Sequence, residues 1–151
     1  MDIRVDNLQG PEIVGLLREH LQDMRLNTPL ESVHALDIEA LRSPAITVWS
    51  VWKDAEIMGC GALKALASDH GEIKSMRTVS NHRRKGVAAQ LLAHILQEAK
   101  RRSYRHISLE TGGAEEFAPA RALYTRFGFQ ECGPFGDYGE DPNSIFMSRE
   151  L

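Results

Sequence analysis

One stretch near the middle of the chain, residues 72–92, restricts the fold more than any other part of the sequence. Residues 72–79 (EIKSMRTV) read as an extended segment, and residues 86–102 carry apolar side chains at the spacing of an amphipathic helix. A short basic turn joins the two. A strand that passes through a turn into such a helix indicates a domain in which helices pack against a sheet.

The turn itself has the chemistry of an anion-binding site. Its backbone N–H groups stand at a helix N-terminus, where they lack helical partners and the helix dipole favours negative charge. Gly86 permits close approach of a bulky anion, and Ala88 and Ala89 keep the first helical turn unobstructed. Residues 83–85 (RRK) add positive charge. We interpret the turn as a diphosphate-binding site; the alternative is an ordinary solvated basic turn.

Composition limits the class of protein. With 151 residues, 42% of them hydrophobic, the chain is expected to form one domain, residues 1–151, around a substantial core. The formal net charge of -3 makes the basic turn a local feature and disfavours bulk nucleic-acid binding. The sequence has neither a signal-peptide core nor an apolar run long enough to cross a bilayer, so no membrane partner is expected.

Cysteine and histidine usage gives two further expectations. Cys60 and Cys132 lie in strand-like contexts and are expected to be free thiols, which suits a cytoplasmic protein. The six histidines are scattered, and neither an HExxH motif nor paired CxxC motifs occur, so no metal site is expected.

Hydrophobic periodicity predicts the order of the other elements. A helix follows Pro11 and places His20 and Met24 on its apolar face, and Gly128 is expected to cap a later helix. The predicted order is β-α-α-β-β-β-α-β-α-β-β in one mixed α/β domain. Besides residues 72–79 and 86–102, the expected strands are residues 2–6, 46–52, 57–66, 105–110, 129–133 and 144–149, and the expected helices are residues 11–26, 30–43 and 116–127.

Two motifs resemble those of a known family. Residues 83–88 (RRKGVA) are similar to an acyl-CoA signature, R/Q-x-x-G-x-G/A, and they stand between a strand and a helix as that signature does. The pair Leu123-Tyr124, followed by Gly128-Phe129, resembles the second landmark of the same family. On these motifs the chain is identified as a member of the GNAT superfamily of N-acetyltransferases, as a small bacterial single-domain enzyme. The resemblance implies a central mixed, mostly antiparallel β-sheet with splayed middle strands, flanked by about four α-helices.

The resemblance also implies acetyl-CoA as cosubstrate and no metal. Backbone N–H groups of the turn would hold the pyrophosphate, and they belong to Arg84, Lys85, Gly86, Val87 and Ala88, with Arg83 beside them. The preceding strand would pair with the pantetheine arm, whose amides need backbone partners, through Met76, Arg77, Thr78 and Val79. Phe117 stands where many relatives carry a cofactor-contacting asparagine, so that contact is expected either to be lost or to be replaced by one from Thr111 or Glu116.

For catalysis, the resemblance implies direct transfer of an acetyl group from acetyl-CoA to an amine. Tyr124 would be the general acid that protonates the departing thiolate; the alternative is a tyrosine that only packs. Glu72 would be the general base, or else a carboxylate paired with Lys74 or Arg77, and Glu110 and a water relay are rivals for the same role. The backbone N–H of Arg77, Thr78 or Val79 would stabilise the oxyanion.

The acceptor site is assigned to two regions. Residues 132–147 resemble a subgroup of small bacterial acetyltransferases, some of them named indole-acetic acid acetyltransferases. The expected lining is Ser32, His34, Glu110, Phe135, Asp137 and Tyr138; each also has a local alternative as a turn former, core residue or helix-face residue. An aromatic and acidic lining would favour a small amine with an apolar body. A cationic lining from Arg25, Arg42 or Arg77 would favour an acceptor that carries a carboxylate.

Other functions and an assembly are also considered. A non-catalytic acyl-CoA sensor or partner module is the main alternative, and the presence of Tyr124 and Glu72 argues against it. A nucleotide-binding protein is disfavoured because GxxxxGK[ST] and GxGxxG are absent. A homodimer is also expected, because the resemblance implies dimers formed through this end of the fold and because four apolar residues of the hairpin and the C-terminal strands are expected to be exposed, namely Trp49, Trp52, Phe146 and Met147.

Overall fold

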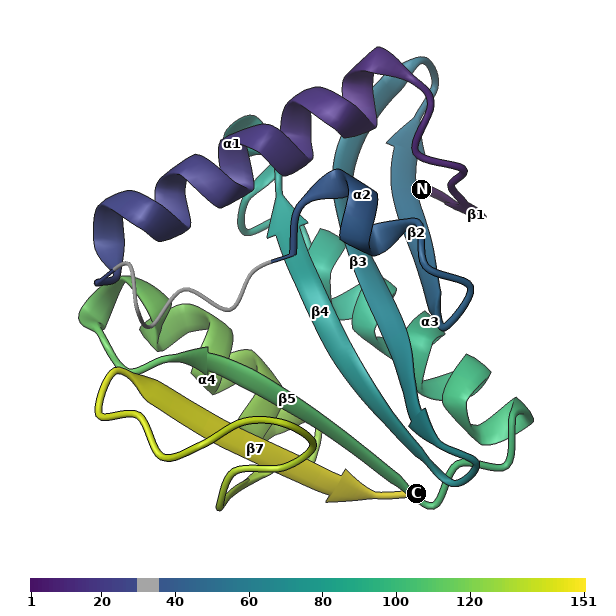
Figure 1. The fold of residues 1–151 in the computed structure, drawn as a ribbon. Coiled ribbons are helices and arrows are strands. Elements are labelled where there is room, and N and C mark those ends of the chain that lie inside the picture. The colour runs from purple at the N-terminus through teal and green to yellow at the C-terminus, as the bar shows by residue number, and fades with distance from the viewer. Residues whose placement is uncertain (30–35) are drawn as a thin grey trace.

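The structure confirms the predicted order of elements. It is a computed structural model that describes residues 1–29 and 36–151 (Figure 1). The strands are β1 (Asp2–Val5), β2 (Ile46–Lys53), β3 (Glu56–Ala67), β4 (His70–Thr78), β5 (His106–Gly112), β6 (Gln130–Cys132) and β7 (Ser144–Glu150). The helices are α1 (Pro11–Asn27), α2 (Ile38–Leu41), α3 (Val87–Arg101) and α4 (Ala118–Arg126), with short 3-10 turns η2 (Ser80–His82) and η3 (Glu115–Phe117) before α3 and α4.

The strands form one sheet in the order β1-β2-β3-β4-β5-β7-β6. Neighbouring strands are antiparallel except β4 and β5, which run parallel and pair only as far as Ile73 and Leu109. Beyond that pair β4 continues to Thr78 and β5 to Gly112, and Figure 1 shows the two strands diverging. The divergence leaves an open edge on β4, as the resemblance implied.

Helices cover the sheet on both faces. In Figure 1, α3 and α4 lie behind the sheet, and α1 and α2 lie in front of it. Leu92 and Ile95 of α3 pack with Ile107 behind the sheet, while Ile13 and Leu41 belong to the separate cluster in front. All five are almost fully buried, and each such side chain contributes about 1.5–3 kcal/mol of transfer free energy. The two clusters therefore fix the helices on which the site depends.

A β-bulge interrupts β4 beside the divergence. The register shifts so that Gly61 of β3 lies opposite two residues of β4, Ser75 and Met76. Ser75 has a positive φ of 56°, which is unusual for a residue other than glycine. The buried Cys60 thiol donates to the Ser75 carbonyl oxygen at 3.5 Å. Bulges redirect side chains next to functional sites, and this one redirects β4 where it leaves β5.

Two helix boundaries differ from those expected. The helix expected over residues 30–43 is seen as Ile38–Leu41, because the Asp37 carboxylate caps it and residues 42–43 already turn away; residues 30–35 lie outside the described part. The helix expected from Glu116 begins at Ala118 because residues 115–117 form a 3-10 turn, and Pro119 then occupies the first turn of α4. Gly128, with φ of 89°, follows α4 as expected.

The residues expected to favour a homodimer are not an exposed apolar surface. Trp49, Phe146 and Met147 are buried in the chain's own core, because inward-facing positions of β2 and β7 face the helices or the loop of residues 133–143. Trp52 is half-buried, with the Arg4 guanidinium 4.8 Å from its ring centre. The premise of that expectation is therefore wrong. Separately, no helix in the described ranges has the length and apolarity needed to cross a membrane.

Candidate active site

A cavity of about 110 Å³ lies where β4 and β5 diverge. Residues of α1 and of α4 contribute to its lining. Its lining consists of His20, Met24, Glu72, Ile73, Lys74, Ser75, Met76, Leu109, Glu110, Thr111, Gly112, Phe117, Ala120 and Tyr124. Glu72 and Met76 of β4, Glu110 of β5 and Tyr124 of the second motif therefore line one cavity, whereas residues 83–88 of the first motif do not line it.

The basic turn after β4 has the geometry of an anion site. Gly86 adopts φ of 81° as the N-cap of α3, and Arg84 is also left-handed with φ of 64°. Within the described part of the chain, the backbone N–H groups of residues 84–89 donate no hydrogen bond. Nothing lies within 4 Å of the point where a Gly86 side chain would begin. Open space above a row of N–H groups at a helix N-terminus suits a phosphate group.

His82, at the start of the turn, links it to β3. Its ring is buried, and Nε2 lies 2.7 Å from the Glu56 carboxylate on β3. Lys85 Nζ lies 3.5 Å from Nδ1 of the same ring. Arg83 and Arg84 remain exposed, so two cationic side chains flank the open N–H groups.

The open edge of β4 offers backbone groups toward the gap. The Val79 N–H donates to the Met58 carbonyl at 2.9 Å, so it faces β3 and is not free to stabilise an oxyanion. Because N–H directions alternate along a strand, Arg77 also faces β3 and Thr78 faces the gap. Of the three backbone N–H groups expected as oxyanion donors, only that of Thr78 faces the gap.

Tyr124 both packs and lines the cavity, so the two interpretations of this residue are compatible. Its side chain is buried, with the Phe129 ring 5.8 Å away in an edge-to-face contact. Burial raises the pKa of Tyr124, and the nearby Glu110 charge raises it further. The hydroxyl is therefore protonated at neutral pH and can donate a proton or a hydrogen bond.

Glu72 is part of a buried three-residue network. Lys74 Nζ lies 2.9 Å from Glu72 Oε2 and 2.8 Å from the Tyr138 hydroxyl, which itself donates to Glu72 Oε2 at 2.6 Å. The side chains of Glu72 and Lys74 are 3% and 8% exposed. The Glu72 charge and burial raise the pKa of Tyr138, which keeps its hydroxyl protonated. Glu72 thus pairs with Lys74, one of the alternatives, and also lines the cavity.

The residues expected to bind the acceptor are only partly brought together. Glu110 lines the cavity, and Tyr138 reaches it through Glu72 and Lys74. Phe135 packs on Tyr138 with ring centres 5.2 Å apart and does not line it, while Asp137 is exposed. Ser32 and His34 lie outside the described residues.

Phe117, Thr111 and Glu116, the residues named for the asparagine contact, lie in different surroundings. Phe117 lies against Gly112, where an added side chain would begin 2.2 Å from its ring. Thr111 lines the cavity beside it, whereas Glu116 is exposed and does not. Of the two substitutes expected for the asparagine contact, Thr111 is the one in position.

The three arginines that were considered as a cationic lining of the acceptor site do not line the cavity. Arg77 donates to Glu19 at 2.9 Å and to Asp23, both on α1. Arg42 pairs with Glu39 and donates to the Leu8 carbonyl at 3.0 Å. Arg25 is exposed on α1 and does not line the cavity.

The lining residues that were not predicted as site residues include His20, Met24, Lys74 and Ser75. His20 and Met24 had been assigned to the apolar face of α1, and a histidine on such a face was the available signal. Burial lowers the pKa of His20 to about 4, with the Arg77 charge lowering it further and the Asp23 charge opposing. Its ring is therefore neutral at neutral pH.

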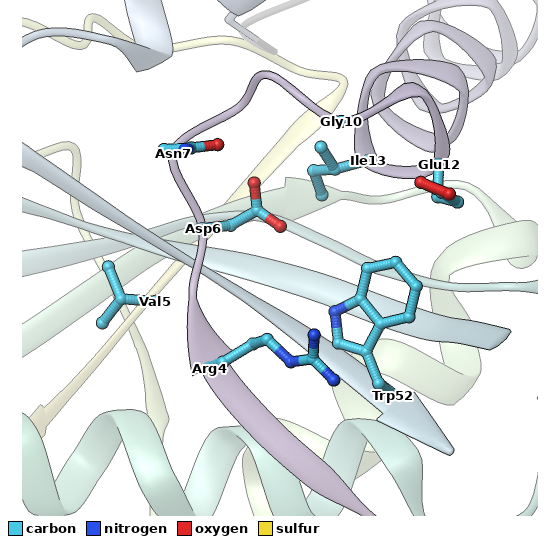
Figure 2. Close-up of a pocket in the computed structure, with 8 residues that line it drawn as sticks. All are labelled: Arg4, Val5, Asp6, Asn7, Gly10, Glu12, Ile13 and Trp52. Carbon is cyan, nitrogen blue, oxygen red and sulfur yellow. The ribbon is translucent and has the colours of Figure 1, made fainter. Parts of the chain in front are cut away.

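A larger cavity of about 250 Å³ lies apart from these residues, between β1 and the start of α1 (Figure 2). Asp6 faces it but already accepts hydrogen bonds from Ser50 Oγ at 2.6 Å and the Leu8 N–H at 2.7 Å. None of the sequence-predicted site residues lines it. Across the described ranges, no three His, Cys, Asp or Glu residues form a group that could hold a metal ion.

Comparisons with known proteins agree with this geometry. The sequence model of the Acetyltransferase (GNAT) family matches residues 13–129. The chain is 58% identical over 151 residues to "Uncharacterized N-acetyltransferase YsnE" of Bacillus subtilis, covering 100% of both chains. It is 46% identical over 149 residues to "Uncharacterized N-acetyltransferase YedL" of Escherichia coli, covering 99% of this chain and 94% of that one.

A solved structure shares the fold. The GNAT family acetyltransferase from Elizabethkingia anophelis with acetyl-CoA bound superimposes with a TM-score of 0.70 at 20% identity, covering 99% of this chain and 97% of that chain. The splayed sheet, the turn before α3 and the sequence match agree with one another, and the chain belongs to the GNAT family of acetyltransferases.

Proposed function

We propose that this chain is an acetyl-CoA-dependent N-acetyltransferase that moves an acetyl group directly to the amine of a small-molecule or amino-acid-like acceptor. The main support for the proposal is that the cavity, the open edge of β4 and the basic turn follow one another along the chain. The open edge of β4 leads at one end into the cavity and at the other into the turn with unpaired N–H groups.

The turn would hold the pyrophosphate. Six successive N–H groups from Arg84 to Ala89 lack partners within the described chain, and the space beside Gly86 is open because nothing lies within 4 Å of the point where a side chain would begin. Arg83, Arg84 and Lys85 would add charge at the rim. Backbone donors of this kind bind a diphosphate without depending on any one side chain.

The open edge of β4 would bind the pantetheine arm as an added strand. Thr78 presents its backbone toward the gap, and Met76 lines the cavity on the same strand. Amide groups that would otherwise be buried without partners are satisfied by such pairing. This arrangement would bring the thioester into the cavity beside Tyr124.

In the transfer step, the acceptor nitrogen bonds to the acetyl carbonyl carbon and the carbon–sulfur bond breaks. Tyr124 would donate its proton to the departing sulfur, and the nitrogen would lose one proton to a carboxylate or to water. The Thr78 N–H would stabilise the oxyanion. Glu72 and Glu110 are the two carboxylates in the cavity, and both remain candidates for the relay that takes the amine proton.

A thiol-release assay tests the proposal against the alternative of a non-catalytic sensor. Acetyl-CoA and a panel of primary amines are mixed with the protein, and free CoA thiol is followed with time. Amine-dependent release supports an acetyltransferase. Tight acetyl-CoA binding without release for any amine would instead support the sensor.

A further inference from the structure

Strand β1 lies at one edge of the sheet. In the strand order β1-β2-β3-β4-β5-β7-β6, β2 is the only described strand that pairs with it. Its other side therefore has no partner strand in the described part of the chain, and three of its four residues are exposed. An exposed edge presents N–H and C=O groups to which a strand of another molecule can bind.

The backbone groups that face this open edge belong to Ile3 and Val5. The Asp6 N–H, which follows β1, donates to a carbonyl of β2 at 2.8 Å. N–H and C=O directions alternate along an antiparallel strand whose register does not shift, so those of Asp2 and Arg4 also face β2. The N–H and C=O groups of Ile3 and Val5 point the other way, toward the open edge.

Charge selects the register in which two copies can pair through this edge. In a two-fold symmetric pair the strands run antiparallel, and outward-facing residues must lie opposite one another. If Ile3 lies opposite Val5 of the second copy, Arg4 faces Arg4. If Ile3 lies opposite Met1, Asp2 faces Asp2. Of these three registers, only Ile3 opposite Ile3 places Asp2 against Arg4 on both sides of the axis. Opposite charges at facing positions stabilise a strand pair, and like charges destabilise it.

The exposed apolar side chains of β1 favour the same register. Met1 and Val5 are 49% and 69% exposed and are two of the three large hydrophobic residues that face solvent in the described chain. With Ile3 opposite Ile3 they lie opposite each other, so pairing covers both. Figure 2 shows Arg4 and Val5 on opposite sides of the strand. The charged pairs and the apolar pairs would therefore occupy different faces of the joined sheet.

Arg4 is already positioned for such a contact. Its guanidinium lies 4.8 Å from the ring centre of Trp52, and one of its nitrogens lies 2.9 Å from the Asp2 carboxylate of the same chain. Both charged side chains are more than half exposed, so a second copy can reach them. A side chain that is held in place loses less conformational entropy on binding. A second copy would complete a ring of alternating charges.

We propose that two copies of this chain pair edge to edge through β1, with antiparallel strands and Ile3 opposite Ile3 at the two-fold axis. About four backbone hydrogen bonds join the sheets, two between the Ile3 residues and two from the Val5 N–H groups to the Met1 carbonyls. With roughly five residues a side, against roughly 20–30 in a standard interface, the dimer is weak and reversible. The interface uses no residue that lines the cavity between β4 and β5, so it is independent of the proposed acetyl transfer.

Charge reversal tests the register. Sedimentation of the full chain, without added residues before Met1, is expected to show a dimer whose fraction grows between about 10 µM and about 1 mM. Arg4→Asp sets acidic side chains against one another, and Asp2→Arg sets basic ones, so each should weaken the dimer at least about tenfold. Mixing the two variants should restore association, because each basic strand then faces an acidic one. Arg126→Glu, which makes the same charge change as Arg4→Asp at an exposed position of α4, should leave the dimer unchanged.

Three results would overturn the proposed pairing. A wild-type chain that stays monomeric at about 1 mM has no such edge contact. A wild-type dimer that neither charge reversal weakens is formed through another surface. A mixture of the two folded variants that does not associate shows that Asp2 and Arg4 do not face each other.

A measurement on the unmodified chain remains informative if a variant does not fold. Exchange of the backbone amide hydrogens is followed by NMR, and at about 1 mM the Ile3 and Val5 amides should exchange at least about threefold more slowly than at about 50 µM. The Asp6 amide, which already donates to β2, is the internal control and should not change. Equal exchange rates of Ile3 and Val5 at both concentrations would contradict the pairing.

Discussion

At the scale of single residues, burial determines what Tyr124 can contribute. Its ring packs on Phe129 and the residue lines the cavity, and burial raises the pKa of its hydroxyl. A phenol in this state stays protonated at neutral pH and can donate a hydrogen bond to a departing thiolate. The sequence motif identified the residue, whereas its lining of the cavity required the fold.

Tyr124→Phe should therefore separate chemistry from binding. The ring and its packing remain, so stability should change little, while loss of the proton donor should lower kcat by about a hundredfold to ten-thousandfold. The acetyl-CoA KM should stay nearly constant. Steady-state kinetics provides the measurement, and Tyr104→Phe is a matched control because Tyr104 is buried outside the cavity. Equal kcat values, with chemistry rate-limiting, would make Tyr124 a packing residue.

Gly86 gives a residue-scale test of the pyrophosphate assignment. Any side chain there meets open space but must adopt φ near 81°, which costs about 1–2 kcal/mol of stability. Gly86→Val should in addition obstruct the anion and weaken acetyl-CoA binding at least about tenfold. Gly86→Ala is the control for backbone strain. Affinity is measured by calorimetric titration with acetyl-CoA. If folded Gly86→Val bound acetyl-CoA as tightly as wild type, the assignment of the turn as the pyrophosphate site would be wrong.

His20 predicts a pH dependence of stability. Its pKa falls from the ordinary 6.5 to about 4 in the folded protein, so the unfolded chain binds more protons between those values. The contribution of His20 to the free energy of unfolding is therefore fully present above pH 6.5 and is lost as the pH falls toward 4. The resulting loss in the free energy of unfolding is roughly 3 kcal/mol.

Denaturant unfolding between these pH values checks that prediction. Arg77, Asp23, Glu72 and Glu110 surround the ring or line the same cavity and also affect the curve. The informative quantity is therefore the difference in the free energy of unfolding between wild type and His20→Asn at each pH. His20→Asn should lose less stability on acidification; parallel curves would show that His20 is not held neutral by the fold.

At the scale of elements, the strand, turn and helix around Gly86 could be predicted because each has its own local signal. Apolar spacing defined α3, and the glycine and basic residues defined the turn. The bulge at Ser75 had no such signal, because its conformation is fixed by the pairing of β4 with β3. The pairing of Arg77 with Glu19 and Asp23 likewise depends on where α1 lies, more than fifty residues earlier in the chain.

The Tyr138 hydroxyl links the loop between β6 and β7 to Glu72 and Lys74 of β4. Tyr138→Phe keeps the ring stacked with Phe135 but removes a hydrogen bond to Glu72 and the oxygen that accepts from Lys74. Both partners are buried, so the expected loss is about 1–3 kcal/mol in the free energy of unfolding. Chemical denaturation measures it, with exposed Asp137→Ala as the control. An unchanged midpoint and slope would show that the network does not stabilise the loop.

At the scale of the whole molecule, the order of elements followed from periodicity, and the splayed sheet followed from the resemblance. The composition of the cavity did not, because it combines side chains of α1, β4, β5 and α4 that are far apart in the sequence. Glu72, Glu110 and Tyr124 were predicted from motif and position. His20 and Lys74 were not, since a histidine on an apolar face and a lysine in a strand have more common structural explanations.

The measurement that tests acetyl transfer most directly identifies the product. Wild-type protein is incubated with acetyl-CoA labelled with ¹³C in the acetyl group and with each member of the panel of primary amines, and the mixture is analysed by mass spectrometry. We expect a labelled N-acetyl amine that forms together with free CoA thiol and much more slowly with Tyr124→Phe. Binding of acetyl-CoA with release of labelled acetate alone, and no labelled amide for any amine, would contradict the account.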